Sequence, residues 1–234
     1  MQYDPFQQQA INFIDQGFST IVSAPTGAGK TAIAQFLIED CLKRGRKIIY
    51  TAPIKALSNQ KFRDFTETYQ DKVGILTGDI TINPQGSTLI MTTEIFRNKI
   101  LEENFSLKEY EWIIFDEIHF IDDFERGTVW EESLIFLPDH MRLLGLSATI
   151  PNINELAGWL ESIHHNPIKT IVETKRPVPL HVFYQCQNKI YDNFQSLVKE
   201  GYRGRKEDFR GQRFLKEKES KPNRVGSLIN YLLQ

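Results

Sequence analysis

The sequence predicts an α/β fold: a doubly wound, mostly parallel sheet with helices on both faces. Over roughly the first 175 residues, short β-branched or apolar runs alternate with segments of helical spacing, the pattern of a parallel sheet covered by helices. Residues 48–50 and 113–115 are apolar throughout, as in strands buried on both faces. Ligands of such sheets bind beyond the carboxyl ends of the strands, so the residues that follow each strand are the candidates for chemistry.

Strands are predicted where Val, Ile, Leu, Thr or aromatic residues form short runs. These runs are residues 20–23, 47–51, 73–76, 88–92, 112–115, 143–147 and 168–172. Helices are predicted where apolar residues recur three or four positions apart. These segments are residues 5–15, 30–42, 55–68, 94–101, 128–137 and 153–162.

The pattern changes near Pro177 and Pro179, which end the preceding element. A strand-like segment at residues 181–186 follows, then a polar, basic stretch and an apolar helical pattern at residues 225–233. We therefore predict three parts. They are a large α/β domain at residues 1–180, a linker or basic extension at 181–224, and the start of a truncated second domain at 225–234.

Charge and composition narrow the function classes. The net charge is −2, but residues 199–224 hold ten Lys or Arg against five Asp or Glu. Such a stretch is consistent with a solvated loop and with a nucleic-acid contact.

No apolar run approaches the roughly 18 to 20 residues that cross a bilayer, and no secretory signal is visible, so no membrane contact is expected. With only Cys41 and Cys186, neither a disulfide framework nor a zinc site is predicted, which favours a cytoplasmic location, or a nuclear or organellar one.

A phosphate-binding loop is predicted directly after the first strand. The sequence Ala-Pro-Thr-Gly-Ala-Gly-Lys-Thr at residues 24–31 fits the loop motif, except that Ala24 stands where the motif has its first glycine. Lys30 would reach the β and γ phosphates, and the Thr31 hydroxyl would bind Mg²⁺. The alternative is an ordinary turn between a strand and a helix. The predicted nucleotide-binding residues of the loop are Thr26, Gly27, Ala28, Gly29, Lys30 and Thr31.

An acidic pair, Asp116 and Glu117, follows the predicted strand at residues 112–115. If both strands belong to one parallel sheet, this pair lies beside the phosphate-binding loop. Asp116 would then hold the magnesium shell, and Glu117 would orient and deprotonate the water that attacks the γ phosphate. A DE pair alone is a weak signal, but together with the loop it predicts a nucleoside triphosphatase.

Further motifs carry a resemblance to a known family. Asp-Glu-Ile-His at residues 116–119 and Ser-Ala-Thr at 147–149 resemble superfamily 2 helicases. Glu-Arg-Gly-Thr-Val-Trp-Glu-Glu at 125–132 and Arg-Pro-Val-Pro-Leu at 176–180 resemble the superkiller-type (Ski-like) branch of DExH-box RNA helicases. The likeness covers about residues 6–180 and implies the first RecA-like domain of such an enzyme. It implies ATP and Mg²⁺ as cofactors, and ATP hydrolysis coupled to translocation on single-stranded RNA and duplex unwinding.

The resemblance also implies roles for single residues. Phe6 and Gln7 match the family's adenine-recognising segment, and a glutamine amide can both donate to and accept from the adenine edge. His119, Ser147 and Thr149 match the residues that couple the γ-phosphate site to nucleic-acid binding, although a lone histidine is also often structural. The residues that match the nucleic-acid groove are Pro53, Lys55, Gly78 and Thr93. Helix capping is the alternative for Thr93, and an ion pair and a core anchor are favoured for Arg126 and Trp130.

The implied partners are single-stranded or partly duplex RNA, with DNA possible, a second RecA-like domain, and RNA-degradation machinery. In this family the second domain supplies arginines that stabilise the transferring phosphoryl group, and the arginines at residues 203–213 do not match its pattern. We therefore expect the 234-residue chain to bind ATP–Mg²⁺ weakly and to hydrolyse it barely. Two alternatives stay open: a DNA helicase of the same superfamily, and a nucleotide-dependent scaffold that binds RNA or protein without unwinding.

Overall fold

The computed structural model describes residues 3–102, 106–179, 181–186, 189–199, 202–203 and 215–216. The chain divides into two compact units, Met1–Pro177 and Val178–Gln234. In the second unit, the strands β9 (Tyr184–Cys186) and β10 (Lys189–Tyr191) pair antiparallel, as do β11 (Tyr202–Arg203) and β12 (Leu215–Lys216). The helix α7 (Phe194–Lys199) lies between the two pairs in sequence.

The first unit is built on a sheet whose strand order is β4-β3-β5-β2-β6-β7-β1-β8. Every neighbouring pair is parallel except β3 and β4. In chain order the strands are β1 (Ser19–Ser23), β2 (Lys47–Ala52), β3 (Val73–Leu76), β4 (Thr81–Ile82), β5 (Thr88–Thr92), β6 (Tyr110–Asp116), β7 (Arg142–Ser147) and β8 (Ile168–Val172). The central strands are buried on both faces, which explains their continuous apolar sequence.

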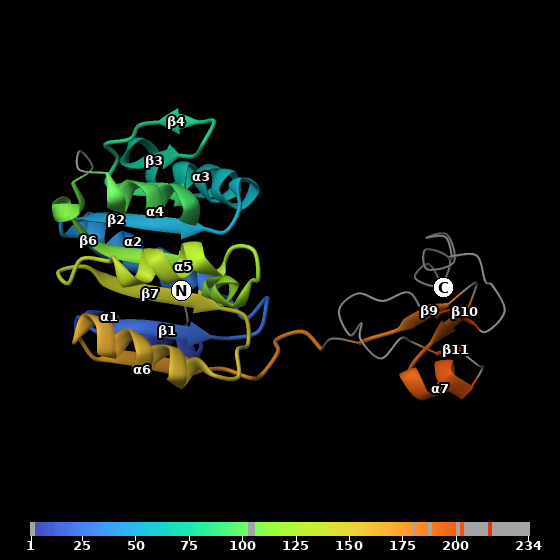
Figure 1. The fold of residues 1–234 in the computed structure, drawn as a ribbon. Coiled ribbons are helices and arrows are strands. Elements are labelled where there is room, and N and C mark those ends of the chain that lie inside the picture. Colours follow the sequence, from blue (N-terminus) through green and yellow to red (C-terminus); the bar gives the residue numbers. More distant parts are fainter. Residues whose placement is uncertain are drawn as a thin grey trace. The chain divides into compact units, whose positions relative to one another are not determined.

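Three long helices cover each face of this sheet. One apolar core joins the sheet to α1 (Pro5–Asp15), α2 (Lys30–Lys43) and α3 (Lys55–Tyr69). The other joins it to α4 (Thr93–Leu101), α5 (Gly127–Ile135) and α6 (Ile153–His164), which lie on the near side of the sheet in Figure 1. Three short 3-10 helices, η1 (Gln70–Lys72), η2 (Leu107–Glu109) and η3 (Ile118–Asp122), connect these elements. The predicted doubly wound α/β fold is confirmed.

Trp130 is the largest side chain among the fully buried ones and is 1% exposed. It packs on the ring of Phe115, with the two centroids 6.0 Å apart, and stacks on Phe120 at 6.4 Å. Trp130 therefore joins α5 to strand β6 and to η3, the segment that follows the acidic pair. The interpretation of Trp130 as a core anchor agrees with this packing.

The sequence analysis missed strand β4, whose two residues carry no periodic signal. This strand and its turn fold closely over β3: a Cβ on Gly74 would lie 2.0 Å from the Asn83 carbonyl oxygen, so only glycine fits there. The Asn83 side chain fixes the turn by donating to the carbonyl oxygens of Asp71 and Val73. Elsewhere, residues 181–183 are not strand, and the helix predicted at 128–137 ends at Ile135. The helix predicted at 225–233 lies outside the described residues.

Candidate functional site

The register of the sheet brings the two predicted motifs to one edge. Strand β7 lies between β1 and β6, and Leu146 is in register with both Val22 and Asp116. Adjacent strands are about 4.8 Å apart, so the Asp116 backbone lies roughly 10 Å from Val22. The loop at residues 24–29 and the acidic pair thus leave the sheet side by side.

The loop at residues 24–29 leads directly into α2, which begins at Lys30. Gly27 and Gly29 have φ angles of +86° and +85°, a region that residues with a Cβ rarely adopt. The Lys30 ammonium folds back into the loop and donates to the carbonyl oxygens of Ala24 and Pro25, at 2.8 and 3.3 Å. Burial lowers the pKa of Lys30 below the ordinary lysine value, against the opposing influence of the charges of Glu117 and then Asp116. Together with the sheet register, the influence of both charges on the Lys30 pKa is consistent with one shared site.

Gln7 ties the first helix to the same loop. Its side-chain Oε1 accepts from the Asp4 amide at 2.9 Å, and its Nε2 donates to the Gly29 carbonyl oxygen at 3.0 Å. A Cβ on Gly29 would lie 2.7 Å from Gln7 Nε2, so the glycine is also needed for this close approach. Gln7 is buried, and so is Phe6. Each end of the Gln7 amide still retains a second hydrogen-bonding position.

The acidic pair has two different environments. Asp116 Oδ2 accepts from the hydroxyl of the fully buried Tyr50 at 2.5 Å, and burial followed by the Asp116 charge raises the pKa of Tyr50 well above its usual value. Glu117 has a φ of 59°, the left-handed region that non-glycine residues seldom occupy. That backbone turn redirects the chain from β6 into η3 and leaves the Glu117 side chain about 30% exposed. Glu117 is therefore accessible to a solvent molecule, whereas Asp116 is held in place.

The donors near Thr31 fit a magnesium ion of the kind found with nucleotides. The described residues hold no group of three or more His, Cys, Asp or Glu that could bind a metal. Mg²⁺ does not need such a group, because it keeps several waters and is held by one or two carboxylates together with substrate phosphates. The Thr31 hydroxyl and the Asp116 carboxylate are oxygen donors of this type. The Thr31 hydroxyl accepts from Lys61 Nζ at 3.3 Å.

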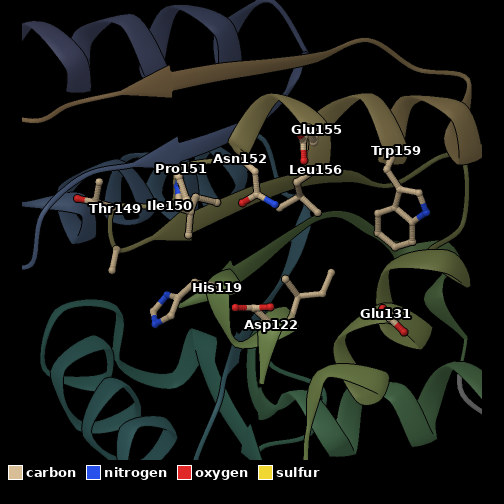
Figure 2. A pocket seen from close by; sticks show the side chains of 12 residues that line it. His119, Asp122, Glu131, Thr149, Ile150, Pro151, Asn152, Glu155, Leu156 and Trp159 are labelled. Atoms are coloured by element: carbon tan, nitrogen blue, oxygen red, sulfur yellow. The ribbon is translucent and has the colours of Figure 1, made fainter. Parts of the chain in front are cut away.

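Two of the predicted coupling residues, His119 and Thr149, line a pocket of about 800 Å³ between η3, α5 and α6, and Ser147 is not among its lining residues. Figure 2 shows His119 and Asp122 of η3 facing Thr149 and the loop that leads into α6. His119 Nδ1 lies 3.3 Å from Glu117 Oε2 but makes no hydrogen bond within the protein. Among the described residues, the buried Ser147 hydroxyl also has no hydrogen-bond partner.

Ser23 makes the connection to the Ser-Ala-Thr segment instead. This residue is the last of β1, and its hydroxyl accepts from the Ile150 amide at 3.0 Å and donates to the Ala148 carbonyl oxygen at 3.3 Å. The Ala24 amide continues the link by donating to the Ser147 carbonyl oxygen at 3.1 Å. The loop after β7 is thereby fastened to the start of the phosphate-binding loop.

Substitution of Ser23 by Ala is expected to lower the free energy of unfolding of the first unit by about 1–3 kcal/mol, because it leaves the partly buried Ile150 amide and Ala148 carbonyl without this hydrogen-bond partner. Urea denaturation measures this change. Ser133→Ala is the matched control: Ser133 is equally buried, but its hydroxyl donates only to the Val129 carbonyl oxygen of its own helix. Equal destabilisation by the two substitutions would show that the hydrogen bonds of Ser23 contribute no more to stability than the single intrahelical bond of Ser133.

A second groove, of about 470 Å³, contains the predicted nucleic-acid residues Pro53, Lys55 and Gly78. Lys55 Nζ pairs with Asp79 Oδ1 at 3.0 Å, and hydrogen bonds from Lys55 and then Thr77 lower the pKa of Asp79. Thr93 lies behind this surface: it is fully buried, and its hydroxyl donates to the Ala52 carbonyl oxygen at 3.5 Å. The capping alternative for Thr93 is wrong, because Thr92 is the residue whose hydroxyl accepts from the Ile95 amide and caps α4.

Arg126 also lines the second groove, where its Nη1 donates to the Pro53 carbonyl oxygen at 3.2 Å. The favoured interpretation of Arg126 as an ion-pair member is therefore replaced by a main-chain contact. Sequence reasoning did not find Tyr50, Lys61 or Ser23. Tyr50 and Ser23 stand in apolar strand runs, and Lys61 belongs to a polar helix face, so no local pattern marked them.

A phosphate-binding loop and an acidic pair at the carboxyl edge of one parallel sheet define a P-loop nucleotide-binding protein. The chain belongs to the DEAD/DEAH box helicase family, whose model matches residues 4–156. None of the helices in the described ranges is long and apolar enough to cross a membrane.

Relatives narrow the branch to Ski-like helicases of superfamily 2. The chain is 48% identical to the DExH-box ATP-dependent RNA helicase DExH9 of Arabidopsis thaliana, over 80% of this chain and 19% of that protein. It is 50% identical to human Superkiller complex protein 2, over 76% and 14%, and 49% identical to the human Exosome RNA helicase MTR4, over 76% and 17%. The chain thus spans less than a fifth of the length of each of these relatives.

Solved structures confirm the fold. The chain matches Mycobacterium smegmatis helicase Lhr bound to ssDNA and AMP-PNP with a TM-score of 0.63 and 25% identity, over 75% of this chain and 26% of that one. It matches the DUF1998 helicase MrfA bound to DNA with a TM-score of 0.61 and 18% identity, over 73% and 27%.

Proposed function

We propose that this chain is the first ATP-binding motor domain of an ATP-dependent RNA helicase. The observation that carries the proposal is the sheet register, which brings the phosphate-binding loop after β1 and the acidic pair at the end of β6 to one edge of the sheet. Family membership implies use of ATP. In this proposal the backbone N–H groups of residues 26–29 and the Lys30 ammonium would bind the phosphates, and Lys30 would then leave the carbonyl oxygens of Ala24 and Pro25. Phe6 and Gln7 would recognise the adenine ring.

Mg²⁺ is the proposed metal, with Thr31 and Asp116 as the residues that hold it. Bound there, the ion would neutralise charge on the transferring phosphate. Glu117 is the proposed general base: it is exposed enough to orient a water and accept its proton. Tyr50 keeps the Asp116 carboxylate in a fixed orientation by donating to one of its oxygens.

Coupling to the nucleic acid is proposed to run through His119, Ser147 and Thr149. The unpartnered Ser147 hydroxyl and His119 Nδ1 support this role, because buried polar atoms without a partner are uncommon and these two flank the acidic motif. The single-stranded nucleic acid is proposed to lie in the groove of Pro53, Lys55 and Gly78, with Thr93 supporting its wall from behind. Contacts there would be to sugars and phosphates, and therefore tolerant of sequence.

The whole protein is proposed to have a second RecA-like domain that closes over the nucleotide. The proposed division of this chain places the motor domain at residues 1–180, an extension at 181–224 and the start of the next domain at 225–234. The printed names of the relatives, which include an exosome helicase and a superkiller complex protein, support RNA-degradation machinery as a partner. A cytoplasmic location, or a nuclear or organellar one, is proposed accordingly.

A DNA helicase is the second candidate, because two structural neighbours are bound to DNA. In the full-length protein, we expect single-stranded RNA to stimulate ATP turnover at lower concentration than DNA of equal sequence, since only RNA offers 2′-hydroxyls. Titration of both strands at fixed ionic strength measures the difference. Equal stimulation, or a preference for DNA, would contradict an RNA-specific motor and favour the second candidate.

A further inference from the structure

Lys61 of α3 extends to the residue that follows the phosphate-binding lysine. Its ammonium donates to the Thr31 hydroxyl at 3.3 Å and lies 5.9 Å from the centroid of the Tyr50 ring. The hydroxyl of the same Tyr50 donates to Asp116. A positive charge is therefore held against one of the two proposed magnesium donors and within reach of the aromatic residue that fixes the other.

Lys30, the other cation of this site, does not take that place. Its ammonium is engaged by the carbonyl oxygens of Ala24 and Pro25 inside the phosphate-binding loop. Lys61 comes from a different element, is partly buried, and crosses from α3 to α2 to make its contact. The Thr31 hydroxyl thus accepts a hydrogen bond from a lysine that lies outside the loop motif.

We propose that Lys61 is a tethered cation that competes with Mg²⁺ for the Thr31 hydroxyl, and so raises the Mg²⁺ concentration at which the protein binds nucleotide. The Lys61 ammonium occupies one of the two lone pairs of the Thr31 hydroxyl oxygen, and its charge repels a divalent cation that approaches the same oxygen. Mg²⁺ demands near-ideal octahedral geometry at about 2.0–2.1 Å. Lys61 must therefore leave Thr31 before the metal binds. This inference rests on the proposed function, because it concerns the same nucleotide site.

The test is Mg²⁺-dependent binding of fluorescent ADP to the full-length protein, which requires no turnover. Lys61→Met removes the charge and retains an unbranched side chain. We expect it to lower the Mg²⁺ concentration for half-maximal ADP binding by about 10-fold, the size of effect that outer-shell residues typically have on metal affinity. Lys61→Arg keeps a positive charge and is expected to keep most of the Mg²⁺ requirement.

Two further variants separate competition from a general disturbance of the site. Arg63→Met is the control for loss of charge, because Arg63 is exposed on the same helix, and it should leave the Mg²⁺ requirement unchanged. Tyr50→Phe keeps the ring beside Lys61 but removes the hydroxyl that orients Asp116. It is expected to raise the half-saturating Mg²⁺ concentration, the opposite direction to Lys61→Met.

An unchanged or raised half-saturating Mg²⁺ concentration for Lys61→Met, in a protein whose wild type binds ADP with Mg²⁺, would overturn the inference and leave the proposed function standing. A shift in the same direction for Lys61→Met and Tyr50→Phe would also overturn it, because it would indicate loosening of the site. A wild-type protein without any Mg²⁺-dependent nucleotide binding would reject the proposed function and this inference together.

Discussion

The 234-residue chain is expected to hydrolyse ATP about 10³ to 10⁵ times more slowly than the full-length protein at saturating RNA. The reason is that the proposed second domain would supply arginines to the transferring phosphoryl group, and the chain spans less than a fifth of the length of DExH9, human MTR4 and human Superkiller complex protein 2. Steady-state phosphate release by both proteins measures the ratio.

The comparison needs evidence that the isolated chain is folded, which urea denaturation supplies. Addition of the following domain as a separate polypeptide should restore part of the turnover if the missing groups come from that domain. Several ATP hydrolysed per second by the purified chain with RNA would show instead that the described motifs are sufficient for catalysis.

Substitution of Glu117 by Gln in the full-length protein is expected to lower ATP turnover about 10²- to 10⁴-fold, the usual contribution of general acid–base catalysis. Gln has the same shape and can still hydrogen-bond a water, but it cannot accept the proton. The side chain is about 30% exposed, so the exchange should not disturb the core. Turnover is measured by phosphate release, and nucleotide affinity by fluorescent ADP binding.

ADP affinity should stay within a few-fold of the wild-type value, because Glu117 is not among the proposed nucleotide ligands. Asp116→Asn is the informative comparison: it should weaken Mg²⁺-dependent binding as well as turnover, since Asp116 is the proposed metal residue. The scaffold alternative makes a different prediction for Glu117→Gln, namely that biological activity survives. Loss of unwinding with retained nucleotide binding would count against the scaffold.

The sequence predicted much of this fold because local patterns carry it. Three strands, β3, β5 and β8, and the helix α1 have the predicted bounds, since the hydrophobic pattern of each begins and ends within its own segment. The placement of the glycine-rich loop and the acidic pair was also predictable, because each motif is required directly after a strand. In an all-parallel core, that requirement alone sends both motifs to the same edge.

Other features depended on contacts that no local pattern encodes. The Thr93 hydroxyl is buried because the backbone of β2 passes behind it, and β4 exists because Asn83 folds the chain back over Gly74. From the local sequence, only the composition and spacing of residues in these two segments can be judged. Neither composition nor periodicity reports which atoms a side chain meets once two elements have packed together.

By itself, then, the sequence determined the α/β order, the positions of the phosphate-binding loop and the acidic pair, and the helicase family. Only the tertiary structure decided that Tyr50 holds Asp116, that Lys61 reaches Thr31 and that Ser23 fastens the loop after β7. These partners lie between 30 and 127 residues apart in the chain. Their contacts exist because strand register and helix packing bring the side chains within hydrogen-bonding distance, a condition that depends on the whole fold.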